Sequence, residues 1–152
     1  MNNPFKGLMK MRILTKYHGE TEISEVIEFE KGIPGFPDEK KFTLLPLSEE
    51  NIFFAMQSIE TPELAFIVSS PFHFFKEYDF KLDEVSVGEL GIETEKDVEV
   101  YSILTVEDPF VNTTANLQAP IILNRQSLKA KQVIIHDSTY ATKHPIFESA
   151  KG

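Results

Sequence analysis

Residues 52–70 read IFFAMQSIETPELAFIVSS and contain two nearly continuous apolar runs, at positions 52–56 and 64–68. Both runs are rich in aromatic and β-branched side chains, which favour strands. Between them, Thr61 and Pro62 favour a turn, because proline fixes its own φ and has no N–H to donate to a neighbouring strand. Strands buried on both faces carry such continuous runs, so this stretch predicts a β hairpin in the interior of a sheet.

Short apolar runs recur through the rest of the chain, separated by Pro, Gly, Asn or clusters of charge. In residues 22–29, Ile23, Ile27 and Phe29 alternate with polar residues, which predicts one face on a core and the other in water. Helical periodicity is nearly absent, and the whole pattern is typical of a small β sandwich or barrel. The expected strands are 12–17, 22–29, 41–45, 52–57, 65–69, 98–106, 117–123 and 132–136.

Residues 72–91 are the one region in which this β pattern fails. Within it, the sequence SVGEL places Ser86 three residues before Glu89, which is the spacing of a capping box with Ser as the N-cap. We therefore expect one or two short helical turns there. No repeat, low-complexity run or flexible linker divides the chain, so the prediction is a single domain of mainly β structure.

The domain is predicted to span residues 11–147. Met11 begins the sequence MRILTKY, the expected first strand, so residues 1–10 are expected to be a disordered N-terminal extension and residues 148–152 a disordered tail. The first residues lack the apolar segment of an export signal, and no stretch approaches the roughly 18 apolar residues of a membrane span. The expectation is a cytoplasmic protein with no membrane contact.

The formal net charge of the chain is −9. A field of this sign repels phosphate backbones, so direct binding of nucleic acid is not expected, whereas a basic protein partner is plausible. The acidity can equally serve solubility alone. Acidic residues concentrate in residues 20–30 and 77–108, and the balance reverses after Ile121, which predicts an acidic side and a milder basic end.

No pattern for catalysis or metal binding is found in the sequence. The chain has no Cys, and none of its four His residues is spaced as one of a pair of ligands; His136 and His144 are expected at the surface or in turns. The serines before Pro71 lack the nucleophile elbow, and no Gly-rich loop leads into a helix. We therefore predict no catalytic residues, no metal ligands and no cofactor, and a protein that is not an enzyme.

The sequence does offer stiff, partly apolar loops, at residues 29–36, 69–72, 112–124 and 132–140. In the first, FEKGIPGF, Gly32 and Gly35 can adopt positive φ while Pro34 fixes its own φ. This loop is expected to be sharply turned and to point Ile33 and Phe36 in defined directions. From the residues alone, the better interpretation is that both side chains plug the end of a barrel.

The segment NTTANLQAPIILN, residues 112–124, combines signals for a turn and for a strand. Its Asn and Thr side chains, up to Asn116, can close local hydrogen bonds to the backbone, and Pro120 limits pairing on one side of the strand that follows. The segment is either an elaborate turn beside an edge strand, or an edge at which a partner adds a strand or docks a helix.

Taken in order, these segments resemble the FliW family of flagellar assembly factors. Members of that family similarly carry a G-I-P-G-F loop after an acidic strand, an F-x-x-x-Q-S strand matched here by residues 53–58, and an A-F strand that ends in Pro. They also carry an N-L-x-A-P-I segment and a closing Q-V-I strand, and the likeness covers residues 11–147.

The resemblance implies a compact, antiparallel, barrel-like β fold and a cytoplasmic factor that binds flagellin before export. It also implies antagonism of CsrA, a dimeric RNA-binding repressor of flagellin translation, with flagellin and CsrA as mutually exclusive partners. We expect the factor to be a monomer when free. Two alternatives stay open: a dedicated flagellin export chaperone without CsrA antagonism, and a small-molecule-binding β barrel.

Partner-binding residues are expected on the loops and on the acidic surface. They are Gly32, Ile33, Pro34, Gly35, Phe36, Pro71, Phe72, Glu93, Glu95, Asp97, Asn116, Leu117, Pro120 and Asn124.

Overall fold

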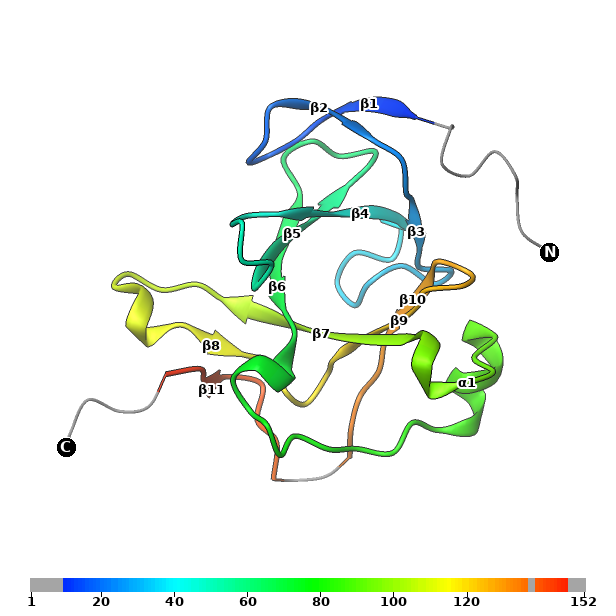
Figure 1. Ribbon diagram of the computed structural model, residues 1–152, viewed down its shortest axis with the longest axis vertical. Coiled ribbons are helices and arrows are strands. Elements are labelled where there is room, and N and C mark those ends of the chain that lie inside the picture. Colours follow the sequence, from blue (N-terminus) through cyan, green and yellow to red (C-terminus); the bar gives the residue numbers. More distant parts are fainter. Residues whose placement is uncertain (1–9, 137–138, 148–152) are drawn as a thin grey trace.

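The computed structural model describes residues 10–136 and 139–147, which are mainly β (Figure 1). The strands that form the central barrel are β3 (Ile27–Glu28), β4 (Lys41–Pro46), β5 (Phe53–Ser58), β6 (Ala65–Ser69), β7 (Val98–Thr105), β9 (Ile121–Asn124) and β10 (Lys129–Gln132). Their order is β7-β6-β5-β4-β3-β10-β9, and a pairing of β9 with β7 closes the ring. The predicted barrel-like β fold is confirmed, with one parallel pair, β3 with β10, among antiparallel ones.

The hairpin at residues 52–70 lies in the interior of the sheet, as predicted. Strands β5 and β6 pair from Phe53 with Ser69 to Gln57 with Ala65, and β4 and β7 flank them. The buried Gln57 amide holds the turn, because its nitrogen donates to the carbonyls of Pro62 at 3.0 Å and Leu64 at 3.2 Å.

The strand predicted at residues 22–29 is wrong as one continuous element. Strand β2 (Glu20–Ile23) pairs with β1 (Met11–Leu14) in a separate two-stranded sheet, seen at the top of Figure 1, whereas β3 belongs to the barrel. The predicted alternation holds, since Ile23, Ile27 and Phe29 are all buried. Alternation reports which face of a strand is covered, and it carries no information on which strand pairs with it.

The C-terminal strands also differ from the prediction. The strand expected at 117–123 is reduced to β9, and the one expected at 132–136 lies earlier, at β10. Two short strands were missed, β8 (Thr114–Ala115) and β11 (His144–Pro145), so His144 lies in a strand, with its ring 5.0 Å from that of Phe75. Strands of two residues depend on their partners and leave no periodic pattern in the sequence.

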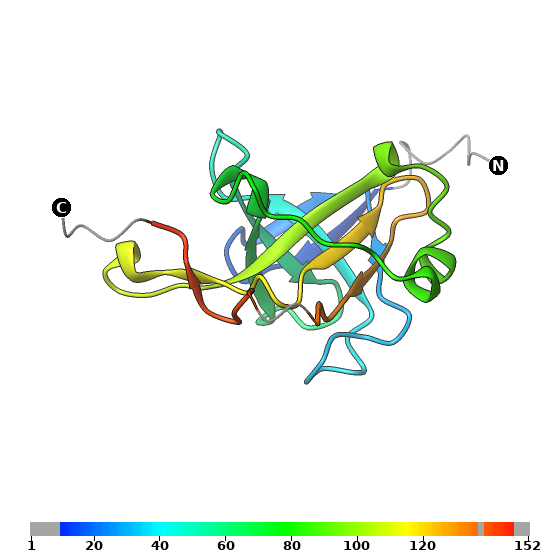
Figure 2. The same cartoon turned by 90° about the horizontal axis from the view of Figure 1, so that it is seen from below.

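Strand β7 belongs to two structures at once. Its first half, from Val98 to Tyr101, pairs with β9 inside the barrel, and Leu104 and Thr105 pair with β8. Figures 1 and 2 show that β7 and β8 leave the barrel together as a projection, which we call the ribbon (residues 104–115). Strand β11 adds to its free side by pairing with β8.

The short helix expected within residues 72–91 is confirmed, but its predicted cap is wrong. Helix α1 (Glu84–Leu90) begins after Asp83, whose carboxylate accepts a hydrogen bond of 3.0 Å from the Ser86 N–H. Asp and Ser are both favoured N-cap residues. The local sequence therefore allows the helix to begin after Asp83 or after Ser86. The described residues also contain the 3-10 turns η2 (Pro71–His73), η3 (Glu95–Asp97) and η4 (Phe110–Asn112).

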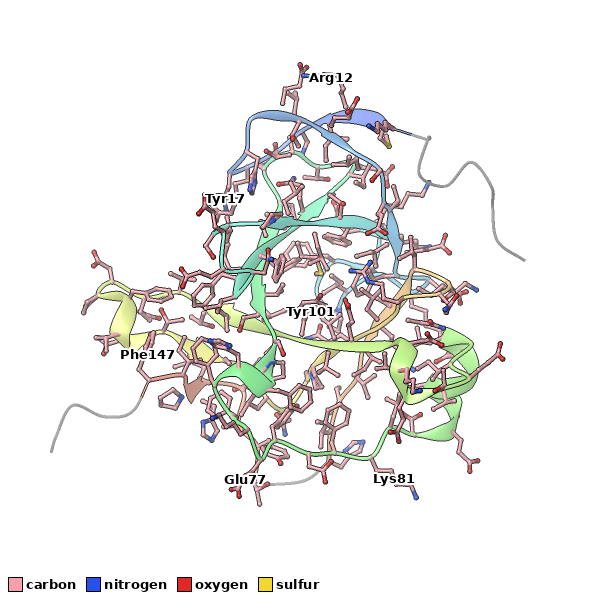
Figure 3. The ribbon with its side chains drawn as sticks, in the orientation of Figure 1. Arg12, Tyr17, Glu77, Lys81, Tyr101 and Phe147 are labelled. Atoms are coloured by element: carbon pink, nitrogen blue, oxygen red, sulfur yellow. The ribbon has the colours of Figure 1, made fainter. Side chains whose placement is uncertain are left out.

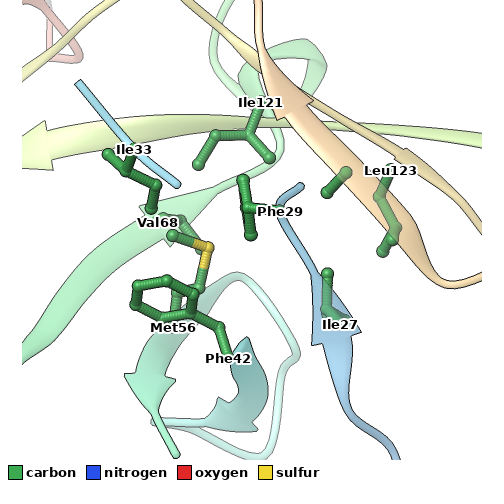
Figure 4. Packing of buried hydrophobic residues seen from close by; sticks show 9 residues of the cluster. Ile27, Phe29, Ile33, Phe42, Met56, Val68, Ile121 and Leu123 are labelled. Carbon is green, nitrogen blue, oxygen red and sulfur yellow. The ribbon is translucent and has the colours of Figure 1, made fainter. Parts of the chain in front are cut away.

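Packed side chains fill the barrel interior (Figure 4). The main core contains Ile27, Phe29, Ile33, Phe42, Met56, Val68, Ile121, Leu123 and Ala130. A second cluster lies under the ribbon and contains Tyr78, Leu104, Ala115, Leu117, Ile135 and Ile146. Because protein interiors are close-packed, the barrel has no lumen for a ligand, and any partner must bind its outer surface.

The terminal expectations fall largely outside the described residues. Of the two segments predicted to be disordered, 1–10 and 148–152, only Lys10 is described, and it lies 3.8 Å from Glu22 across an exposed ion pair. In the described ranges, no helix has the length and apolar character needed to cross a bilayer.

Candidate protein-binding site

The loop that contains G-I-P-G-F, residues 29–37, is held by its own backbone. The N–H of Phe36 donates to the Ile33 carbonyl at 2.6 Å, and the N–H of Gly32 donates to the Phe29 carbonyl at 2.9 Å. Gly32 and Gly35 have φ of 70° and 89°, which side chains disfavour. A Cβ at Gly32 would lie 2.4 Å from the Pro37 carbonyl oxygen, so Gly is required there. The predicted sharp turn is confirmed.

The two apolar side chains of this loop point to different environments. Ile33 is 2% exposed and belongs to the main core, so it plugs the barrel as predicted. Phe36 is 41% exposed, and its ring meets the Phe66 ring edge-on at 5.6 Å. The plug interpretation is therefore wrong for Phe36, which is held in place and open to a partner.

A pocket of about 330 Å³ lies between this loop, helix α1 and strand β10. Its walls are largely apolar, from Ile33, Pro34 and Pro37 of the loop, Leu90 of α1 and Ala130 of β10. The pocket lies on the outside of the barrel, where the predicted loop meets α1 and β10, two elements that are distant from it in the sequence.

The charged side chains on the rim of this pocket, three lysines and two glutamates, form ion pairs with one another. Glu89 accepts hydrogen bonds from Lys131 at 2.6 Å and from Lys31 at 3.0 Å, and Lys129 pairs with Glu30 at 3.1 Å. The hydrogen bonds from Lys131 and then Lys31 hold the pKa of the Glu89 carboxyl below its usual value. With the rim charges paired, the apolar walls are the surface that this pocket offers to a partner.

The predicted basic end of the molecule is wrong for Arg125, Lys129 and Lys131, which are paired with acidic residues. Lys129 and Lys131 are paired on the pocket rim, and Arg125 pairs with Glu25 at 3.0 Å and with Glu99 at 3.2 Å. The tertiary structure interleaves these cations with the acidic segments, although the sequence separates them.

A small polar network adjoins Arg125. The hydroxyl of Tyr101, labelled near the centre of Figure 3, donates to Glu99 at 2.8 Å. Burial, and then the hydrogen bond to Glu99, raise the pKa of Tyr101, so its hydroxyl keeps the proton that it donates. The Glu99 carboxylate thus accepts a hydrogen bond from the Tyr101 hydroxyl and forms an ion pair with the Arg125 guanidinium. Because Glu99 lies on β7 and Arg125 follows β9, the ion pair joins these two strands.

The predicted acidic residues Glu93, Glu95 and Asp97 follow helix α1 in the chain. Glu93 and Glu95 are exposed; Glu93 follows α1 and Glu95 begins η3. Asp97 is half-buried: its carboxylate accepts a hydrogen bond of 3.2 Å from the Gln126 amide, and its carbonyl accepts one of 2.7 Å from the Arg125 N–H. Glu93 and Glu95 are thus exposed on the segment between α1 and β7, whereas Asp97 is held by the barrel.

Asn124 has a structural role that the sequence did not indicate. Its side-chain nitrogen donates to the carbonyls of Leu90 at 2.8 Å and Gly91 at 3.2 Å, and its oxygen accepts from the Gln126 N–H at 2.9 Å. This buried amide ties the end of α1 to β9. Asn124 can therefore influence the pocket by positioning Leu90, but its side chain is inaccessible to a partner.

The remaining predicted residues lie apart from the pocket. Asn116 accepts hydrogen bonds from the N–H groups of Gln118 and Ala119 at 3.1 and 3.0 Å, which confirms the local turn. Leu117, Pro120 and Pro71 are buried, so they can contribute only by packing. Phe72 is 42% exposed and lies in η2, toward the ribbon.

Sequence reasoning missed the residues that complete the pocket. These are Glu30, Lys31, Pro37, Glu89, Leu90, Lys129, Ala130, Lys131 and Gln132. The ion pairs of Glu89 join it to residues 58 and 42 positions away in the chain. Pairs so distant in sequence leave no local signal. Within the described ranges, no group of three or more His, Asp or Glu is placed to hold a metal ion.

The fold and the site together define a small closed β-barrel domain with a filled interior and a preorganised apolar pocket on its outer surface. The family model described as FliW protein matches residues 12–146 of the chain. Flagellar assembly factor FliW of Bacillus licheniformis is 59% identical over 138 residues, which cover 90% of this chain and 96% of that protein. The factor of the same name from Bacillus subtilis is 57% identical over equal shares.

A solved structure agrees with these sequence relatives. The crystal structure of a flagellar assembly factor FliW superposes with a TM-score of 0.87 at 48% identity, and the match covers 92% of this chain and 99% of that one. The chain belongs to the FliW family of flagellar assembly factors.

Proposed function

We propose that this protein is a cytoplasmic flagellar assembly factor that binds flagellin and CsrA, one at a time, and so relieves CsrA repression of flagellin translation. It acts through protein contacts and without catalysis. Membership of the FliW family supports the role in flagellar assembly. The observation that carries the binding proposal is the exposed Phe36 on a rigid loop, beside a pocket whose rim charges are paired.

The loop suits protein recognition for a physical reason. Binding costs free energy for every segment that must be ordered, and a loop held by positive-φ glycines is already ordered. An exposed aromatic side chain beside an apolar cavity is typical of the anchor residues that dominate interface energies. A partner can therefore cover Phe36 and insert an apolar side chain of its own between Pro34 and Leu90.

The charge of the protein suits one of the two partners in particular. An RNA-binding repressor presents basic surface, and a net charge of −9 accelerates its encounter with this protein. Glu93 and Glu95 are exposed on the segment that leads from α1, one wall of the pocket, into β7, and they contribute to this attraction. If both partners use one pocket of about 330 Å³, their binding is mutually exclusive.

The binding experiment compares two exposed aromatic residues. Phe36→Ala removes the proposed anchor, and Tyr17→Ala is the matched control, since Tyr17 is 48% exposed on the β1–β2 hairpin, labelled in the upper part of Figure 3. Titration calorimetry with purified CsrA and with flagellin should show weaker binding for Phe36→Ala and unchanged binding for Tyr17→Ala. Equal affinities for the wild type and Phe36→Ala would remove this pocket from the proposal.

A competition experiment separates the proposal from its alternatives. Flagellin added to the complex with CsrA should release CsrA, and the protein alone should not shift flagellin leader RNA in a gel. Binding of flagellin without any binding of CsrA would favour the dedicated export chaperone. The small-molecule-binding barrel has little support, because side chains fill the barrel interior.

A further inference from the structure

Four phenylalanine rings from four separate segments, one of them in the ribbon, pack in a closed cycle in which each ring contacts two others. Phe53 begins β5, Phe74 follows η2, Phe110 begins η4 and Phe147 follows β11. The ring centroids are 5.9 Å apart for Phe53 and Phe74, 6.1 Å for Phe74 and Phe147, 5.7 Å for Phe147 and Phe110, and 5.6 Å for Phe110 and Phe53. Figure 3 shows Phe147 next to the ribbon.

This phenylalanine cluster is rigid and partly open to solvent. Its spacings lie in the range of favourable aromatic pairs, and each ring restrains two others. Phe110 is 42% exposed, and its neighbours Val106 and Val111 are 49% and 53% exposed. A surface of this kind buries apolar area on binding and loses little side-chain entropy, which is the property of interface anchors.

The charged residues of the ribbon itself are both acidic, whereas Lys143 and His144 come with β11, the strand that pairs with β8. Glu107 and Asp108 are exposed between Val106 and Phe110, and residues 98–124 contain no Lys, Arg or His. The N–H of Glu107 donates to the hydroxyl of Thr113 at 3.0 Å, which fixes the backbone that carries these carboxylates. This arrangement differs from the pocket rim, where each carboxylate has a lysine partner.

We propose that the ribbon and the phenylalanine cluster form a second docking surface, for a segment of a partner protein that carries arginine or lysine among apolar side chains. The apolar side chains cover Val106, Phe110 and Val111, and the cations pair with Glu107 and Asp108. Guanidinium and ammonium groups are also attracted to the faces of aromatic rings. An anionic membrane and a second copy of this acidic chain would both be repelled.

This surface is separate from the pocket, so the inference goes beyond the proposed function. The pocket is lined by the loop, α1 and β10, and no residue of the ribbon or of the phenylalanine cluster contributes to it. Figures 1 and 2 show the ribbon and α1 on opposite sides of the molecule. A partner on the ribbon and a partner on the pocket can therefore be bound at the same time.

The test uses two designed amphipathic peptides labelled with fluorescein, one of Leu and Arg and one of Leu and Glu. In fluorescence anisotropy at physiological salt, the Leu/Arg peptide should bind and the Leu/Glu peptide should not. Phe110→Ala should weaken binding about tenfold, as expected for loss of an anchor. Val111→Ser should also weaken it, and it provides a second variant if Phe110→Ala lowers the melting temperature.

A pair of charge variants separates local pairing from general attraction. Glu107→Gln with Asp108→Gln should weaken binding and flatten its salt dependence. Glu60→Gln with Glu63→Gln removes the same charge from the β5–β6 turn, at the other end of the hairpin from Phe53, and should have little effect. Equal losses from the two pairs, or none from Phe110→Ala and Val111→Ser, would overturn the proposal.

Two further measurements distinguish this surface from the pocket and from lipid. Phe36→Ala should leave peptide binding unchanged, so the failure of the pocket proposal and the failure of this one are separate results. Peptide binding lost equally in Phe36→Ala would place the peptide on the pocket and overturn the inference. Binding of the protein to phosphatidylserine vesicles, abolished by Phe110→Ala, would overturn it in favour of a membrane.

Discussion

The pocket and the ribbon, which we call the loop end and the ribbon end of the molecule, are prepared for binding in different ways. At the loop end, glycines with positive φ set the path of residues 29–37, Ile33 inserts into the main core, and ion pairs join the lysines and glutamates of the rim. At the ribbon end, four phenylalanine rings brace one another above a second cluster, and the carboxylates of Glu107 and Asp108 face no basic residue of the ribbon.

This contrast teaches that rigidity can come from the backbone or from side chains. The loop end depends on a few positions, such as Gly32 and Ile33, whose replacement strains the backbone or opens the core, so single substitutions there should disturb folding as well as binding. The ribbon end depends on many contacts of moderate strength, so single substitutions there should disturb binding more than folding.

The largest effect is expected for Ile33→Ala at the loop end. It leaves a cavity in the main core and should lower the free energy of unfolding by about 2–5 kcal/mol. Phe110→Ala, the matched truncation at the ribbon end, should cost about 1 kcal/mol, because its side chain is 42% exposed. Urea unfolding measures both variants, and equal losses would contradict the contrast.

The next effect concerns the glycines of the loop. Gly32→Ala combines positive φ with a contact of 2.4 Å to the Pro37 carbonyl, and strain alone should cost about 1–3 kcal/mol. Gly35→Ala has positive φ but open space, so about 1 kcal/mol is expected. Gly88→Ala within α1 is the control and should raise stability by about 0.5–1 kcal/mol. A melting temperature that is lower for Gly35→Ala than for Gly32→Ala would contradict this order.

A smaller effect is expected from the Glu89 ion pairs as the pH falls. Hydrogen bonds from Lys131 and Lys31 lower the folded-state pKa of Glu89, so its contribution is present above the unfolded pKa and is lost as pH falls through the folded one. Glu89→Gln should flatten the acid side of the stability profile, and Lys131→Met should do the same. Phe110→Ala keeps every charge and should retain the wild-type slope. An unchanged slope in Glu89→Gln would show that these pairs do not stabilise the loop end.

The smallest effect on stability is expected for Glu93→Lys with Glu95→Lys. Both side chains are exposed, so the free energy of unfolding should change by no more than about 0.5 kcal/mol. Association with CsrA should slow, and its salt dependence should flatten, because long-range attraction acts mainly on the rate of encounter. Glu60→Lys with Glu63→Lys is the control of equal charge. If stopped-flow association rates fall equally in the two double variants, the slower association comes from the change in net charge and not from the position of Glu93 and Glu95.

Much of the fold could be predicted from the sequence, and the candidate site only in part. The hairpin at residues 52–70, the buried alternation of Ile23, Ile27 and Phe29, and the turned Gly32–Phe36 loop all follow from local patterns, since each depends on φ preferences or on which face is apolar. The break between β2 and β3 and the short β8 and β11 depend on partner segments, so no local pattern indicated them. The cap at Asp83 is local, but the sequence around it allowed either Asp83 or Ser86 as the N-cap.

By itself, the sequence determined a mainly β chain with a stiff loop at residues 29–37 and a strongly acidic surface. The alternation of apolar residues in a strand and the φ range of a glycine depend on neighbouring residues, and the net charge is a sum over the chain. Only the tertiary structure decided that Glu89 meets Lys31 and Lys131, that Phe36 is open while Ile33 is buried, and that four distant phenylalanines meet beside the ribbon. Barrel closure brings these segments together, and contacts between residues tens of positions apart are set by the packing of the whole chain.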